Sequence, residues 1–192
     1  MLLFKDIDKF PKSQNGCVVT IGKFDGVHLG HQLIFDQLKS QAVKLDSASL
    51  VIVIEPHPEE FFARHNGRQL IRLNTIREKL ELLETVGVDF VYQLNFDETT
   101  SEISAESYIK DILVDGLGIR GIIIGDDFRF GKNRIGNYSL LEEYGEKYDY
   151  QVFKTAAYER NGHRISSTFE REQLLGSNLD FVTQVQGSPY SI

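Results

Sequence analysis

The chain has 192 residues, 41% of them hydrophobic, and a net charge of −7. This length and hydrophobic content suit one domain with one sizeable core and leave no room for a second full domain. The negative charge argues against nucleic-acid binding, which generally needs basic patches. A single cysteine, Cys17, excludes an internal disulfide framework, and we expect it to be an inert core thiol. No signal sequence or long apolar span is visible, so we expect a cytoplasmic protein with no membrane partner.

Apolar segments that predict strands alternate along the chain with amphipathic segments that predict helices. The predicted strands cover residues 17–21, 49–54, 89–94, 120–124 and 151–154, and the predicted helices cover residues 30–44, 75–86, 104–114, 140–147 and 167–175. This alternation predicts an α/β fold with an open, mostly parallel sheet, and right-handed crossovers place helices on both of its faces. Ligands of such sheets bind at the carboxyl ends of the strands. Four segments follow or lie near those ends and are expected to converge on one crevice: residues 22–31, 56–62, 125–136 and 165–171.

The first of these segments reads GKFDGVHLGH and joins a predicted strand to a predicted helix. Its glycines allow a sharp turn and a close approach to a ligand, while the start of the following helix favours an anion such as phosphate. The three-residue spacing places His28 and His31 on one helix face, where both can donate hydrogen bonds to phosphate oxygens. The glycines match neither the phosphate-loop pattern nor the dinucleotide G-x-G-x-x-G pattern, so adenylyl transfer fits better. A zinc pair is the weaker alternative, because no third ligand stands at motif spacing.

Aromatic residues characterise the second and third segments. Pro56 and Pro58 fix the direction of His57 in the second, and Phe61 and Phe62 offer an aromatic wall nearby. The third segment reads GDDFRFGK from residue 125, and its two phenylalanines can stack on a flat heterocycle or pack into the core. Either carboxylate of this block can hold Mg²⁺ through water, and the residues alone do not decide which one.

Hydroxyl side chains precede an apolar-periodic stretch in the fourth segment. One hydroxyl among Ser166, Ser167 and Thr168 is expected to cap the helix. A capped helix start also presents amides and hydroxyls to phosphates, and Arg171, one turn into the helix, can clamp a departing pyrophosphate. These residue types at this spacing are what a triphosphate site requires.

The motifs together resemble the FMN adenylyltransferase (FAD synthetase) domain of the bacterial bifunctional riboflavin kinase/FAD synthetase family. This family belongs to the H-x-G-H nucleotidyltransferases. The resemblance rests on G-x-F-D-G-x-H-x-G-H at residues 22–31, P-H-P at 56–58, G-D-D-F-R-F-G at 125–131 and S-S-T-x-x-R at 166–171, and it covers nearly the whole chain. It implies a Rossmann-like nucleotidyltransferase fold.

The implied reaction is synthesis of FAD and pyrophosphate from FMN and MgATP, by in-line attack of the FMN phosphate on the ATP α-phosphate. The implied catalytic residues are His28, His31 and Arg171. The implied ATP and phosphate contacts are Gly22, Phe24, Asp25, Gly30, Ser166, Ser167 and Thr168. The implied FMN contacts are His57, Phe62, Asp126, Asp127, Phe128 and Arg129, with Asp127 standing where many members carry asparagine. The metal is Mg²⁺ with the nucleotide, and the residue that holds it is unassigned.

Two features depart from the family pattern. Glu170 stands where an apolar residue is usual. Either its negative charge weakens phosphate binding, or its side chain points away from the site into solvent. Residues 187–192 resemble the hinge that leads to a riboflavin kinase domain in bifunctional members, so residues 1–186 are predicted to be the adenylyltransferase domain, and no kinase signature is present. Two alternatives remain: transfer to another small phosphorylated acceptor, and a flavin- or nucleotide-binding module without turnover.

Overall fold

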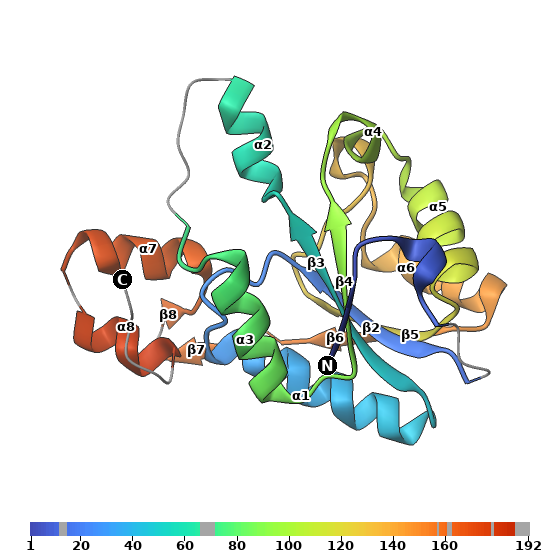
Figure 1. Ribbon diagram of the computed structural model, residues 1–192, viewed down its shortest axis with the longest axis horizontal. Helices are drawn as coiled ribbons and strands as arrows, with labels where there is room; N and C mark the ends of the chain where they lie inside the picture. Colours follow the sequence, from blue (N-terminus) through green and yellow to red (C-terminus); the bar gives the residue numbers. More distant parts are fainter. Residues whose placement is uncertain (12–14, 66–71, 157, 161–162, 178, 187–192) are drawn as a thin grey trace.

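The computed structural model describes residues 1–11, 15–65, 72–156, 158–160, 163–177 and 179–186. A six-stranded sheet forms its centre, with the strand order β1-β4-β3-β2-β5-β6 (Figure 1). Every neighbouring pair in this sheet is parallel. The strands are β1 (Leu2–Phe4), β2 (Cys17–Gly22), β3 (Ala48–Glu55), β4 (Phe90–Asn95), β5 (Ile119–Gly125) and β6 (Gln151–Thr155). The α/β fold with a parallel sheet is therefore confirmed.

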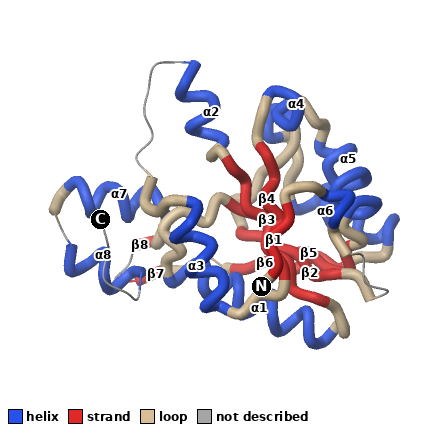
Figure 2. The backbone as a smooth tube through the Cα atoms, in the orientation of Figure 1, coloured by secondary structure: helices blue, strands red, loops and turns tan. Residues whose placement is uncertain are grey.

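Two apolar layers cover the sheet, because successive side chains of each buried strand point to opposite faces. Val19 of β2 and Ile52 of β3 join one core cluster, whereas the adjacent Val18 and Val51 join the other. Helices α1 (Leu29–Lys44) and α3 (Ile76–Val86) pack on the second cluster, and α5 (Ala105–Ser107), the π-helix η2 (Tyr108–Gly116) and α6 (Tyr138–Tyr148) pack on the first (Figure 2). The predicted placement of helices on both faces is confirmed.

The remaining elements lie around this framework. They are α2 (Pro58–His65), α4 (Glu98–Ser101), α7 (Ser167–Leu175), α8 (Leu179–Gln186), the short turns η1 (Ile7–Lys9) and η3 (Lys132–Arg134), and a two-stranded antiparallel pair, β7 (Glu159–Arg160) with β8 (His163–Arg164). In Figure 1, α2 extends beyond the carboxyl end of β3, and α7 and α8 lie together at one side of the sheet. No helix among the described residues is long and apolar enough to span a membrane.

The segment predicted as one helix over residues 104–114 differs from the expectation. Ser104 caps it as predicted, accepting from the Ser107 backbone amide at 3.1 Å, but most of the segment is the wider π-helix η2. The Leu117 amide donates to the Ile112 carbonyl at 2.9 Å, five residues back. A short apolar periodicity does not separate a π turn from an α turn, so the helix type was not predictable.

The strand order places β2 and β5 side by side in the interior of the sheet. From β2 the chain proceeds outward to β3 and β4, and β5 then returns to the other side of β2. Such a reversal of direction is where open α/β sheets bind their ligands, beyond the carboxyl ends of the strands. The glycine-rich segment after β2 and the aromatic segment after β5 both leave the sheet at this point.

Candidate active site

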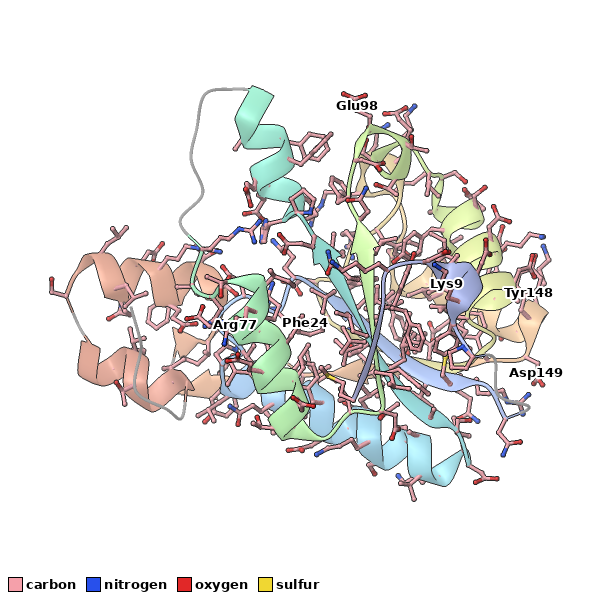
Figure 3. All side chains as sticks on the ribbon, viewed as in Figure 1. Lys9, Phe24, Arg77, Glu98, Tyr148 and Asp149 are labelled. Carbon is pink, nitrogen blue, oxygen red and sulfur yellow. The ribbon has the colours of Figure 1, made fainter. Side chains whose placement is uncertain are left out.

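The turn after β2 has an unusual backbone. Phe24 and Val27 adopt the left-handed region with φ of 44° and 41°, and Gly26 between them has φ of 85°. A β-branched residue at positive φ is rare and costs about 1–3 kcal/mol, so such geometry concentrates at functional sites. Phe24 itself is buried and packs on Phe35 of α1, and Figure 3 labels it beside α3. Phe24 was predicted to contact ATP, and its buried ring supports the turn from below.

The two histidines of this turn are stacked face to face. Their ring centroids are 3.7 Å apart at an angle of 18°, and Phe24 meets the His31 ring edge-on at 5.2 Å. Gly30 permits this, because a Cβ there would lie 3.1 Å from Nδ1 of His28. Nδ1 of His28 and Nδ1 of His31 are both buried without a hydrogen-bond partner. Two orphaned polar atoms in one turn indicate a site that a polar ligand completes.

Burial keeps both imidazoles neutral in the free protein. It lowers the pKa of His28 to about 4, against the smaller opposing effect of Asp25. Burial and then the neighbouring His28 lower the pKa of His31 well below its usual value. Neutral imidazoles still each carry one N–H donor for a phosphate oxygen.

The lowered pKa of His28 predicts a stability loss in acid. The unfolded state takes up a proton as the pH falls below 6.5, whereas folded His28 takes one up only near pH 4, so stability is lost across this window. Between pH 7 and pH 5 the contribution of His28 is about 2 kcal/mol. Urea unfolding at both pH values should find that His28→Asn loses about 2 kcal/mol less than the wild type. Equal losses in the two proteins would contradict the assignment.

Asp25 is the centre of a buried network. Its side chain, 3% exposed, accepts from the Leu73 amide at 3.1 Å and the Asn74 amide at 3.3 Å, and it forms an ion pair with Arg171. The Asp25 carbonyl accepts from Oγ of Ser167 at 2.8 Å. Asp25 therefore holds together the glycine-rich turn, the chain before α3 and the start of α7.

The start of α7 lies against the same turn. Ser166 is the N-cap, accepting from the Phe169 amide at 3.2 Å, so the predicted capping hydroxyl is confirmed. Thr168 is exposed in the first turn, and the side chain of Arg171 is 15% exposed. Glu170 is buried against Gly26. Of the two alternatives predicted for this residue, a side chain pointing into solvent is therefore wrong.

Gly26 cannot carry a side chain without disturbing this arrangement. A Cβ there would overlap Oε2 of Glu170 and lie 3.0 Å from Cδ1 of Leu73. We expect Gly26→Ala to lower the free energy of unfolding by about 1–3 kcal/mol, as measured by urea denaturation. Gly87→Ala is the matched control, because Gly87 also has a positive φ but its Cβ would meet no atom within 4 Å. A smaller loss for Gly26→Ala than for Gly87→Ala would contradict this close packing.

The segment after β3 carries both polar and aromatic groups. His57 is buried, accepts from the Glu59 amide at 3.2 Å, and has its pKa lowered to about 4 by burial and then by Lys23. Proline at the first position of α2 suits a helix start. Phe62 is 53% exposed and meets Phe96 at 5.9 Å, so an aromatic surface faces solvent beyond β3 and β4.

The segment after β5 divides its aromatic residues between core and surface. Phe130 is buried against Tyr108, and Phe128 stacks on Phe130 at 5.6 Å while remaining partly exposed. Asp126 and Asp127 are exposed and face one guanidinium, with their carboxylates 2.8 and 3.1 Å from Nη2 of Arg164. The exposed Arg129 donates to the Phe128 carbonyl at 2.9 Å.

Side-chain ion pairs link the four predicted segments, the third of them through the residue that precedes the fourth. Asp25 pairs with Arg171, Lys23 pairs with Glu59 at 2.5 Å, and Arg164 pairs with Asp126. Asp25–Arg171 and Lys23–Glu59 each join two of the segments, and Arg164, which directly precedes the fourth segment, pairs with the third. The predicted convergence at the carboxyl ends of the strands is therefore observed for the segments themselves, while ligand contacts of individual residues stay predictions.

Several polar residues of the site were not predicted. Lys79 is buried and donates from Nζ to the Lys23 carbonyl at 2.6 Å. Arg72 lies 2.6 Å from Glu55 and also pairs with Glu60, which joins α2 to the end of β3. Of these residues, only Lys79 could have been found from the sequence, because helix periodicity places this lysine on the apolar face of α3.

Two further observations bear on the choice of site. Among the described residues, no three His, Cys, Asp or Glu side chains are grouped to hold a metal ion, so the zinc alternative gains no support.

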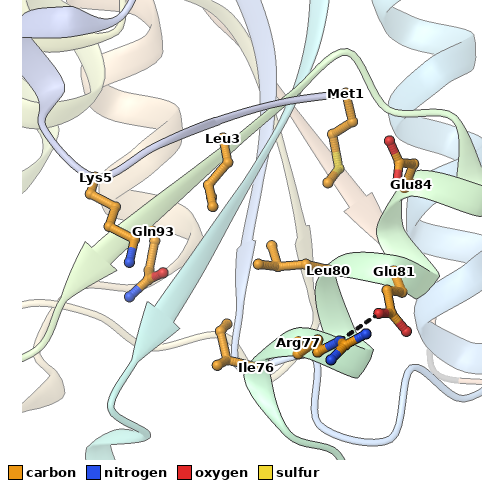
Figure 4. Close-up of a pocket in the computed structure, with 9 residues that line it drawn as sticks. All are labelled: Met1, Leu3, Lys5, Ile76, Arg77, Leu80, Glu81, Glu84 and Gln93. Carbon is orange, nitrogen blue, oxygen red and sulfur yellow. Dashed lines mark hydrogen bonds and ion pairs between the residues drawn. The ribbon is translucent and has the colours of Figure 1, made fainter.

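A separate cavity of about 350 Å³ lies between β1 and α3, where Leu3, Ile76 and Leu80 line it beside the Arg77–Glu81 ion pair (Figure 4). None of its lining residues belongs to the four segments.

Sequence comparison identifies relatives over most of the chain. Residues 10–169 match the model of the FAD synthetase family. The chain is 39% identical over its full length to a bifunctional riboflavin kinase/FMN adenylyltransferase of Buchnera aphidicola subsp. Schizaphis graminum. It is 38% identical, over 93% of its length, to the protein of the same description from Escherichia coli K12. The chain spans 61% and 56% of the length of these curated relatives.

Solved structures share the fold at lower sequence identity. A crystal structure described as a macrolide-efflux protein from Streptococcus pneumoniae matches with a TM-score of 0.83 at 22% identity, over 98% of this chain and 62% of that one. A pantoate-beta-alanine ligase from Francisella tularensis matches with a TM-score of 0.60 at 10% identity, over 97% and 78% of the two chains. These likenesses concern the fold alone. With the match over residues 10–169, the chain belongs to the FAD synthetase family.

Proposed function

We propose that the chain is an FMN adenylyltransferase that makes FAD and pyrophosphate from FMN and MgATP. The stacked His28 and His31, each with a buried Nδ1 that has no partner in the protein, are the observation that carries this proposal. They lie at the start of α1, directly after a strained turn that is tied through Asp25 to the start of α7. Backbone amides and neutral imidazole donors suit a triphosphate, and the family and its curated relatives support the same reaction.

In this reaction an oxygen of the FMN phosphate attacks the α-phosphorus of ATP. The new P–O bond forms as the bond from the α-phosphorus to the bridging oxygen breaks, and pyrophosphate leaves with that electron pair. The FMN phosphate is already ionised at neutral pH, so no covalent enzyme intermediate is needed. His28 and His31 donate to the oxygens on which charge accumulates, and Arg171 binds the departing pyrophosphate.

The proposed FMN contacts are His57, Phe62, Asp126, Asp127, Phe128 and Arg129. The exposed ring of Phe62 and the partly exposed ring of Phe128 supply flat apolar surface for the flavin. The proposed triphosphate contacts besides the histidines are Gly22, Gly30, Ser166, Ser167 and Thr168. Mg²⁺ enters as part of the MgATP substrate and neutralises phosphate charge. Because Asp126 and Asp127 face Arg164, we assign neither as its ligand.

Residues 1–186 are proposed to be the adenylyltransferase domain. The predicted hinge, 187–192, lies outside the described residues. The riboflavin kinase activity in the relatives' description is not carried over to this chain. A cytoplasmic location and the lack of a nucleic-acid partner remain predictions.

Chromatographic detection of FAD tests the proposal. The purified chain is incubated with FMN, ATP and Mg²⁺, and riboflavin replaces FMN in a parallel reaction. We expect FAD from FMN and none from riboflavin. FMN binding without FAD formation would instead favour a binding module, and transfer to a different phosphorylated acceptor would favour the other alternative.

A further inference from the structure

Lys79 is a buried basic residue on the face of α3 that packs against the sheet. It is 3% exposed, whereas lysine is almost never fully buried in proteins unless it has a partner. Leu83, one turn later on the same helix, is an ordinary member of the second core cluster. Nζ of Lys79 instead donates to the Lys23 carbonyl of the glycine-rich turn at 2.6 Å. A position that suits an apolar side chain therefore carries a hydrogen-bond donor directed at the site.

This hydrogen bond is made next to a left-handed residue. The Lys23 carbonyl belongs to the peptide group that precedes Phe24, and the φ of Phe24, 44°, is the rotation between that peptide group and its Cα. Such a conformation persists only where the surrounding structure holds it. On the other side of Phe24, the Asp25 carboxylate accepts from the Leu73 amide, just before α3. Both neighbours of Phe24 are therefore held by α3 and the residues that precede it.

The ring of Phe24 connects this backbone to the two histidines. It meets the His31 ring edge-on at 5.2 Å, and His31 stacks on His28 at 3.7 Å. The same ring covers the end of β2, because a Cβ on Gly22 would lie 2.8 Å from Cζ of Phe24. Closely packed side chains transmit small displacements to their neighbours. A rotation of the peptide group before Phe24 would therefore move the surface against which His31 packs.

We propose that Lys79 is a positioning residue, which holds the glycine-rich turn in the conformation that stacks His28 on His31. The inference rests on the proposed function, since Lys79 serves adenylyl transfer only if the two histidines act on the phosphates. An amine donates a hydrogen bond as an ammonium group does, so this role does not depend on the charge of Lys79. Misplacing a catalytic group by about 1 Å can slow a reaction about a hundredfold.

The first test compares the turnover of Lys79→Met with that of the wild type. Methionine has a similar length and suits a buried position, but it has no donor for the Lys23 carbonyl. We expect kcat for FAD synthesis to fall by about tenfold or more. The FMN dissociation constant should change little, because Phe62 and Phe128, the proposed stacking surfaces, come from other segments.

Lys39→Met is the matched control for this test. Lys39 lies on α1 outside the four segments, and its Nζ also donates to a backbone carbonyl of another element, that of Val86 at 2.9 Å. The same change of residue therefore removes the same kind of bond at a distance from the site in sequence. The control should keep both the wild-type kcat and the wild-type FMN affinity.

A second measurement needs no substrate. Stacked aromatic rings shift each other's proton resonances, so NMR of the ligand-free full chain with labelled histidine reports the stacking of His28 and His31 directly. We expect the ring-proton signals of both histidines to move in Lys79→Met and to stay in place in Lys39→Met. A loss of stability alone would not move these signals while the protein remains folded.

The outcomes separate this inference from the function on which it rests. Either an unchanged kcat or unchanged histidine signals in folded Lys79→Met overturns the role of Lys79, and neither result contradicts the proposed function. If the wild type makes no FAD, the proposed function is wrong, and the role of Lys79 in adenylyl transfer falls with it even where the signals move. Circular dichroism checks folding. If Lys79→Met does not fold, Lys79→Gln takes its place, because its side chain is one bond shorter, and Lys39→Gln becomes its control.

Discussion

Replacing His31 by alanine is expected to lower the turnover of FAD synthesis by about 100-fold or more. The imidazole of His31 is held between Phe24 and His28, and its Nδ1 has no partner within the protein. Removing it withdraws a preorganised donor from the reacting phosphate. FMN affinity should change little, because Phe62 and Phe128, the proposed stacking surfaces, come from other segments. Steady-state kinetics and a separate FMN titration measure the two effects.

Leu33→Ala serves as the control for this prediction. Leu33 lies on α1 near His31 but is 45% exposed, so its loss should affect neither turnover nor FMN binding. If turnover and FMN affinity fall together in His31→Ala, the histidine has a structural role. If turnover is retained, the proposed mechanism is wrong.

Replacing Asp25 by alanine is expected to lower the free energy of unfolding by about 4 kcal/mol. The change leaves the Leu73 and Asn74 amides without their acceptor and Arg171 without its carboxylate. Removing one member of a buried ion pair is costly because the remaining charge loses this partner while it stays mostly buried. Urea unfolding followed by circular dichroism measures the loss.

Two further variants test whether the stability loss of Asp25→Ala comes from the buried network. Asp25→Asn keeps an acceptor oxygen and should lose less stability than Asp25→Ala. Asp36→Ala removes a carboxylate that is 69% exposed and pairs with Lys39 at the surface, so it should cost at most about 1 kcal/mol. A loss in Asp25→Ala no larger than that in Asp36→Ala would contradict the network described above.

Local patterns predicted the sheet but not all of its surroundings. Residues 17–21 are apolar and mostly β-branched, and the strand they predicted is observed as β2. The edge strand β1 has three residues and pairs with β4, far along the chain, so it leaves no periodicity to detect. Pro58 was interpreted only as fixing the direction of His57, yet it also begins α2, where its missing amide costs no hydrogen bond.

The parts of the site that are formed by residues close in sequence could be predicted. The spacing of His28 and His31 predicted one shared face, and their rings are stacked. The role of Asp25 was not predictable in the same way, because its partners lie 48 and 146 residues away. The direction of Glu170 depends on how α7 packs on the turn, which no local pattern encodes.

The separation between Asp25 and Arg171 also has a consequence for biosynthesis. A protein grows from its N-terminus on the ribosome, and Arg171 follows Asp25 by 146 residues. The five major strands, β2 to β6, are all translated before Arg171 emerges. A nascent chain at that stage has the residues of its sheet but lacks the cation that neutralises Asp25. The ion pair that completes this part of the site can therefore form only after residue 171 has been synthesised.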